Sequence, residues 1–190
     1  MASLQEKLTE DRVRQSIVRA GIDADVFTEL KSLDQVLQGA PPELWQPFDN
    51  FLRAELEHVV SHTERRDIFE SALKSMFRNF AGAAVTFEEV CNRLQVWLDL
   101  HFYGMPPEWP AIAHENYLRL VVAELTRTRS ERRAEAGTAI RKFVMLHLGL
   151  TTAALLHSEQ EHYRQQLFYD AGTRLPGPEL FIETLDRHIA

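Results

Sequence analysis

Apolar residues recur every three or four positions along most of the chain, which predicts amphipathic α-helices separated by glycine and proline. No stretch shows the sustained alternation of apolar and polar residues that is typical of β-strands. The predicted helices cover about 8–20, 23–38, 42–60, 64–81, 87–103, 107–128 and 130 to beyond 163. The pattern therefore predicts an all-α protein with about seven helices, the last of which is long.

Local signals fix several of the helix ends. Asp23 is placed to cap the helix that follows it, and Thr86 with Glu89 has the form of a capping box. The pair Pro41-Pro42 fits the start of a helix, because proline is tolerated in a first turn. We expect a glycine, Gly104, to end the helix over 87–103.

Composition narrows the class of protein. The formal net charge is -7 and the basic residues are scattered, so no basic footprint for nucleic acid is visible. The single cysteine, Cys91, can form no internal disulfide. The charged N-terminal stretch does not have the form of a signal peptide, and no apolar run approaches the ~20 residues of a membrane span. We expect a cytoplasmic protein that binds neither nucleic acid nor membrane.

The helix over 87–103 carries the most informative face. Val90, Leu94, Trp97, Leu98 and His101 fall on one side of a helix, so we expect His101 to point into the core near the helix end. Neutral imidazole in an apolar surround is a good axial ligand for haem iron. Two plainer interpretations stay open: a cation that suits the helix C-terminus, or a core histidine bonded to a backbone carbonyl.

The stretch LKSMFRNFAGAAVTFEEVCNRLQVWLDLHFYGMPPEWPAIAHENYLRLV resembles the middle of the globin-coupled sensor family. The resemblance covers roughly residues 20–160 and implies a globin-like fold with haem held by His101 as the metal ligand. The last helix has apolar residues on several sides and needs a partner surface, so we also expect a homodimer formed through the last two helices. About seven crossed helices around a buried site suit that architecture better than a four-helix bundle. The matching residues are Phe77, Gly82, His101, Gly104, Pro107, Trp109 and Tyr117.

The resemblance also implies which residues line the haem (iron protoporphyrin IX). The expected lining residues are Phe48, Leu52, Leu73, Met76, Phe77, Trp97, Met105, His114 and Tyr117. The family commonly places a tyrosine in the helix that matches 42–60, and this helix has none. An apolar distal side gives bound O2 no hydrogen-bond donor, which leaves NO or CO as gaseous ligands. Met76, His58 or His62 could instead provide a second protein ligand to the iron.

Two further patterns compete with the haem interpretation. His147 lies on an apolar face, where we expect a hydrogen-bonded core or interface histidine. Glu55 with His58, and Glu159 with His162, match the Glu-x-x-His spacing of a di-iron bundle. The second pair lies in a charged run that a dry core could hardly accept, so we disfavour a di-iron site.

The C-terminal segment LFYDAGTRLPGPELFIETLDRHIA resembles the opening of a diguanylate cyclase (GGDEF) domain through Asp170, Thr173, Leu175 and Pro176. Gly177 and Pro178 replace the family's asparagine and arginine, so the cyclase domain would be degenerate. We therefore expect a sensor domain at 1–160 and the start of an output domain at 161–190.

Together these features predict a haem-based gas or redox sensor, not itself an enzyme, that regulates a c-di-GMP signalling domain. The alternative is a haem-free globin-fold module for dimerisation or protein interaction. In that case, side chains such as Phe77 and Met105 would fill the pocket.

Overall fold

The computed structural model describes residues 10–82, 86–128 and 133–168, with side chains described as far as 160. Every regular element in these ranges is a helix, so the all-α prediction is confirmed. The helices are α2 (Glu10–Arg19), α3 (Ala24–Gln38), α4 (Pro42–Val59), α5 (Thr63–Arg78), α6 (Phe87–Phe102), α7 (Trp109–Arg127) and α8 (Arg133–Phe168). Their bounds agree with the predicted ranges to within about three residues.

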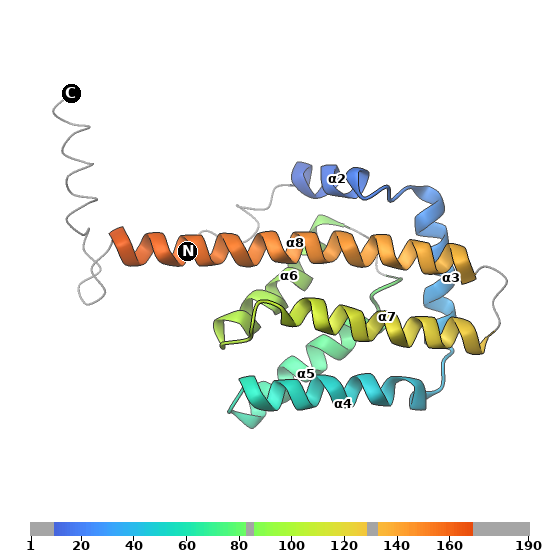
Figure 1. Cartoon of the computed structure of the whole chain (residues 1–190), viewed down its shortest axis with the longest axis horizontal. Helices are drawn as coiled ribbons and strands as arrows, with labels where there is room; N and C mark the ends of the chain where they lie inside the picture. Colours follow the sequence, from blue (N-terminus) through green and yellow to red (C-terminus); the bar gives the residue numbers. More distant parts are fainter. Residues whose placement is uncertain (1–9, 83–85, 129–132, 169–190) are drawn as a thin grey trace.

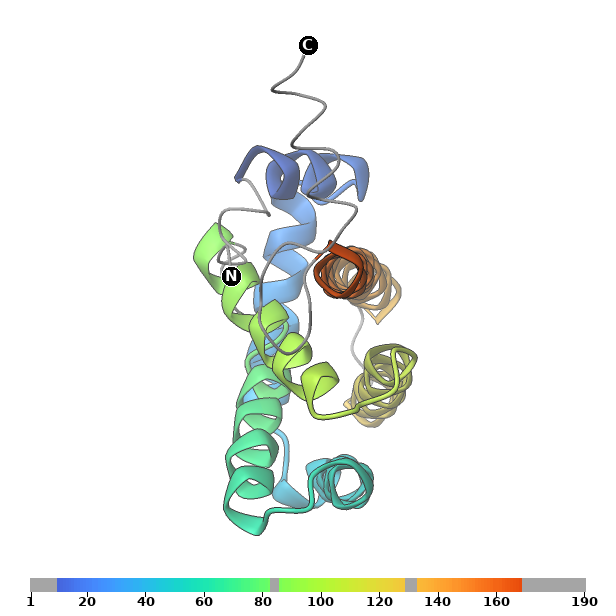
Figure 2. The ribbon, with the colours of Figure 1, turned by 90° about the vertical axis from the view of Figure 1, so that its left-hand side faces the viewer.

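The helices form two layers. α4, α7 and α8 run side by side along the long axis of the molecule, whereas α3, α5 and α6 lie across them (Figures 1 and 2). α8 contacts α3, α6 and α7, and α2 lies against it from outside. The apolar core fills the space between the layers, where α5, α6 and α7 contribute buried aromatic rings.

The local signals act as the sequence predicts. The Asp23 carboxylate accepts a hydrogen bond from the Val26 amide at 3.0 Å, and the Thr86 hydroxyl accepts one from the Glu89 amide at 3.2 Å. Each contact satisfies an amide that the first turn of a helix leaves unpaired. Gly104 turns the chain from α6 toward α7. Its φ of 92° is unfavourable for residues other than glycine, because a Cβ atom would clash with the backbone.

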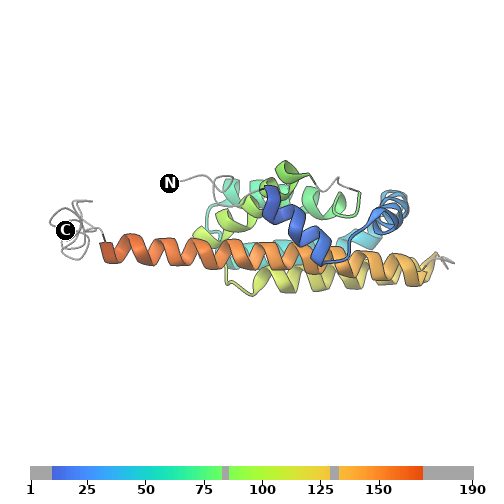
Figure 3. The same ribbon diagram turned by 90° about the horizontal axis from the view of Figure 1, so that it is seen from above.

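α8 passes the expected boundary between 160 and 161 as one continuous helix. It extends beyond the ends of the other helices (Figure 3). By length and composition alone, its stretch Arg133–Gln160 could cross a membrane, although half of the most apolar window is buried inside the bundle. The expectation that no apolar run approaches the length of a membrane span therefore understates this helix. The cyclase-like segment 169–190 lies outside the described residues.

Candidate functional site

His101 lies at the edge of the bundle, on the side of α6 that faces α8. Its side chain is 21% exposed, and its Nε2 atom lies 3.4 Å from a carboxylate oxygen of Glu159. Its Nδ1 atom lies 3.1 Å from the Met105 carbonyl oxygen, which can only accept, so Nδ1 carries a proton. The imidazole therefore joins α6 to α8 and to the turn after α6.

The side chain that enters the core at this turn of α6 is Leu100. It is completely buried, as are Leu94 and Trp97 on the same helix. Successive residues of a helix are separated by 100°, so one residue decides which side chain faces inward. The expectation that His101 points into the core is therefore wrong in this structure. The apolar face of α6 is centred nearer to Leu100 than the sequence pattern suggested.

The residues expected to line a haem are packed against one another. Phe77 meets Phe48 with ring centroids 4.9 Å apart, Tyr117 at 5.3 Å and Trp97 at 6.2 Å. Leu52, Leu73, Phe77, Trp97, His114 and Tyr117 are completely buried, while Phe48, Met76 and Met105 are at most 8% exposed. The structure thus brings all the predicted lining residues into the core, but as one closely packed cluster.

The residues present do not fit a haem in this arrangement. A porphyrin between α5 and α6 would need Phe77 to separate from the rings that it contacts. The imidazole proposed as its ligand would have to turn away from Glu159. Phe77 and Met105, which the alternative prediction expected to fill the pocket, are both buried in the core.

The other predicted metal ligands are dispersed. His58 and His62 are exposed on the surface, and Met76 belongs to the core. Glu55 accepts a hydrogen bond from the Trp109 indole at 3.0 Å, which gives it a structural partner. Among the described residues, no group of three His, Cys, Asp or Glu side chains is arranged to hold a metal ion. His162, from the di-iron pattern, has no described side chain.

The most unusual polar feature is a pair of buried histidines that joins α7 to α8. His114 is completely buried and His147 is 3% exposed. The Nε2 atom of His114 lies 3.1 Å from the Nδ1 atom of His147, and the Nδ1 atom of His114 lies 2.6 Å from the Pro110 carbonyl oxygen. The prediction that His147 is a hydrogen-bonded core histidine is confirmed, whereas the pairing of the two rings was not predicted.

Aromatic rings and a buried cation surround this pair. The Phe80 ring lies 5.3 Å from His114 and 5.2 Å from His147. The Arg93 guanidinium, on α6, lies 5.1 Å from the centre of the same Phe80 ring and is bonded to Glu89 at 3.1 Å. Burial of Arg93 was not predicted from the sequence, because a lone arginine in a helix usually reaches solvent.

Burial disfavours positive charge at this site, and Arg93 adds to the effect. Desolvation, together with the nearby guanidinium, lowers the pKa of His114 to about 4, although its bond to Pro110 acts the other way. Desolvation, His114 and Arg93 lower the pKa of His147 as well. Both rings are therefore neutral near pH 7. Desolvation also lowers the pKa of Arg93 itself.

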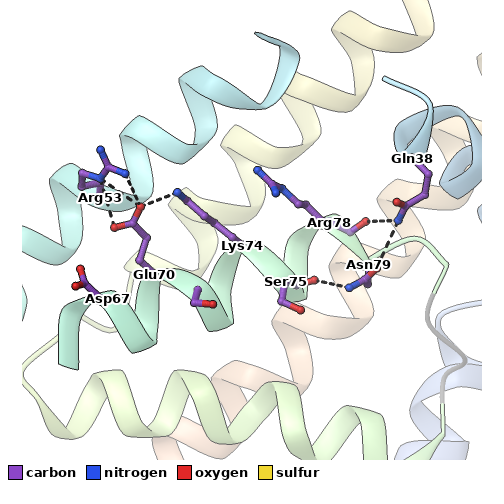
Figure 4. A pocket seen from close by; sticks show the side chains of 9 residues that line it. Gln38, Arg53, Asp67, Glu70, Lys74, Ser75, Arg78 and Asn79 are labelled. Carbon is purple, nitrogen blue, oxygen red and sulfur yellow. Dashed lines mark hydrogen bonds and ion pairs between the residues drawn. The ribbon is translucent and has the colours of Figure 1, made fainter. Parts of the chain in front are cut away.

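A polar cleft lies between α4 and α5 beside the end of α3 (Figure 4). Glu70 accepts hydrogen bonds from Arg53 at 3.0 Å and ion-pairs with Lys74 at 2.6 Å, while Arg78 is 2.8 Å from Asp49. The three cations of the cleft are thus already paired with carboxylates of the same chain. The cleft consequently offers no unpaired positive charge to an anionic ligand, and its ion pairs serve to hold α4 against α5.

Comparisons with protein-family models, with curated proteins and with solved structures find no match to this chain.

Proposed function

We propose that this chain is a haem-free helical module of a signalling protein, with a globin-like arrangement of helices, that dimerises through α7 and α8. The observation that carries the proposal is the surface of α8. Between Phe143 and Leu156 this helix carries no Asp, Glu, Lys or Arg, yet the bundle covers only part of that stretch. A helix of that kind needs a second apolar surface.

The uncovered part of α8 has the spacing of a helix–helix contact. Met145 is 67% exposed and Leu156 is 54% exposed. With Gly149 and Thr152, which are also exposed, they form a row at intervals of four, three and four residues. Such intervals place side chains along one seam of a coiled coil, and small residues in the row let two backbones approach closely. We call the row Met145, Gly149, Thr152 and Leu156 the α8 seam.

A second copy of the chain is the partner that this surface suits. α7 runs beside α8 (Figures 1 and 2) and adds Ile112, which is 42% exposed. Two antiparallel helices from each copy would make a four-helix contact in which each α8 seam covers the other, as in most symmetric dimers. A shift in that contact would move α8 and whatever follows it.

The output of the module is the c-di-GMP domain that the C-terminal resemblance suggests. In the sequence, α8 leads directly into the segment that carries this resemblance, so a movement of α8 would be passed to that segment without an intervening element. We propose no enzymatic activity for this chain and a cytoplasmic location.

A second candidate is haem-based gas or redox sensing through His101. One contact favours it: the Nδ1–H of His101 donates to the Met105 carbonyl, which leaves a lone pair on Nε2, as a metal-bound imidazole requires. The packing of Phe77 against its neighbours counts against this candidate.

The test of dimerisation is light scattering after size exclusion, over a range of concentrations. We expect a dimer for the unaltered chain, and a monomer for Met145→Glu and Leu156→Glu, because each places a carboxylate in the α8 seam. Val18→Glu is the matched control, since Val18 is equally apolar and 73% exposed but lies on α2. The proposal is contradicted if the unaltered chain stays monomeric at every concentration. It is also contradicted if the Val18→Glu variant dissociates as readily as the two variants in the α8 seam.

Haemin titration decides between the two candidates. We expect no saturable Soret band. A stoichiometric band that His101→Ala abolishes would instead establish the second candidate.

A further inference from the structure

The hydrogen bonds of the buried pair fix the proton positions on both rings. The Pro110 carbonyl can only accept, so the Nδ1 atom of His114 carries a hydrogen. In a neutral ring, the Nε2 atom of His114 is then an acceptor, and the Nδ1 atom of His147 must donate to it. The Nε2 atom of His147 is left with a bare lone pair, and it is buried without a hydrogen-bond partner.

This arrangement tolerates an added proton poorly. The first proton would add to the bare Nε2 atom of His147 and leave the central bond in place, but the new N–H group would be buried with no acceptor. A positive charge would also enter a ring of aromatic side chains next to Arg93, which is already charged. A second proton would leave a hydrogen on both of the facing nitrogen atoms, Nε2 of His114 and Nδ1 of His147, which would then repel each other. Protonation therefore disfavours the closed, dry arrangement of the pair and favours one in which α7 and α8 separate enough to hydrate the charged ring.

Few ionisable groups face the pair from the surrounding helices. α6 contributes Arg93, whose partner Glu89 is partly exposed, and α7 contributes Tyr117. α3 contributes Asp34, which acts on Tyr117, whereas the side chains that α5 packs against the pair are the Phe77 and Phe80 rings. Arg93 is therefore the main charge acting on the two imidazoles.

The same bond is a fully buried polar contact that distinguishes one position of α8 from another, whereas the contacts of Glu159 with His101 and of Lys142 with the Gly21 carbonyl are more exposed. An apolar stretch of helix can pack in several rotations at similar free energy, and a buried polar pair selects one of them. Rotation by one residue would place Leu146 or Leu148 opposite His114 and leave its Nε2 atom without a donor. An unpaired buried acceptor of this kind is destabilising, because it loses its hydrogen bond to water without gaining another.

We propose that the His114–His147 hydrogen bond is a latch that sets the position of α8 against α7 and is released by protonation. The latch lies within one copy of the chain, so it does not depend on dimerisation. It gives the module a way to couple proton uptake in the core to movement of the helix that leads out of it.

The test measures the distance between α7 and α8 by double electron–electron resonance. Spin labels at Arg119→Cys and Ser158→Cys, both exposed, lie roughly 25 Å apart along antiparallel helices. Cys91→Ala removes the native thiol, and an excess of unlabelled chain removes distances between copies. We expect one narrow distribution at pH 7.5 that broadens or splits at pH 4, while the far-UV spectrum shows that the helices persist.

The decisive variant is His114→Leu with His147→Leu, which replaces both rings with apolar side chains. We expect a broad or split distribution already at pH 7.5, with no further change at pH 4. His157→Leu, an exposed histidine on the same helix, is the control and should behave as the unaltered chain. A double variant that keeps one narrow distribution at both pH values overturns the latch.

Nitrogen NMR of the imidazoles provides a test that needs no variant to fold. At pH 7.5 we expect both His114 and His147 to carry hydrogen on Nδ1 alone. A protonated ring, or hydrogen on Nε2 of either residue, would overturn the proposal.

Discussion

The Nε2 atom of His101 lies 3.4 Å from a carboxylate oxygen of Glu159, so these residues link the end of α6 to the outer half of α8. The neighbouring Leu100 points the other way, into the core. Of these two adjacent residues, Leu100 packs in the core and His101 makes a contact at its edge. Comparing the effects of substituting each one tests which side of α6 faces inward.

Replacing each of these neighbours with alanine should have very different effects on stability. His101→Ala should cost at most about 1 kcal/mol of unfolding free energy, because a partly exposed polar contact such as that between His101 and Glu159 contributes little. Leu100→Ala should cost about 2–5 kcal/mol, because it leaves a cavity in a buried cluster. Urea denaturation monitored by circular dichroism measures both. Equal losses, or a larger loss for His101→Ala, would show that the histidine is the core residue.

Acid should destabilise the fold before its carboxylates are protonated. The pKa of His114 falls from 6.5 to about 4 on folding, so between these values the unfolded chain binds a proton that the folded core excludes. The free energy of unfolding therefore rises with pH across this window, and this group's contribution is fully present above about pH 6.5. We expect a loss of about 3 kcal/mol between pH 7 and pH 4 from His114 alone.

Urea denaturation at several pH values between 7 and 4 checks this slope. The variant with leucine at both 114 and 147 is the reference, and it should lose much less stability over the same range. If the two proteins show the same slope, the buried histidines titrate normally.

Two glycines should respond oppositely to alanine. Gly104 has a φ of 92° with no neighbouring atom within 4 Å of an added Cβ, so Gly104→Ala adds only backbone strain, about 1–2 kcal/mol. Gly137 lies within α8, also with open space around it, so Gly137→Ala should stabilise the helix by about 1 kcal/mol. Thermal melts of both variants provide the measurement. Stabilisation by Gly104→Ala would contradict the turn described between α6 and α7.

The positions of the helices could be predicted because their causes are local. Asp23 and Thr86 cap the helices that follow them, and Pro42 lies in the first turn of α4, as each residue's chemistry dictates. Phe48, Leu73, Phe77 and Tyr117, which the family resemblance implies as lining residues of a buried site, are all buried. What periodicity could not show is whether those side chains surround a cofactor or one another.

The sequence by itself determined that this protein is helical, where its helices begin and end, and which residues are apolar enough to be buried. Only the tertiary structure decided that Leu100 rather than His101 faces the core, because a rotation of one residue exchanges them. It also decided that His114 meets His147 across 33 positions of the chain. Such contacts depend on how helices cross, and the crossing is set by packing of all the helices together rather than by any local pattern.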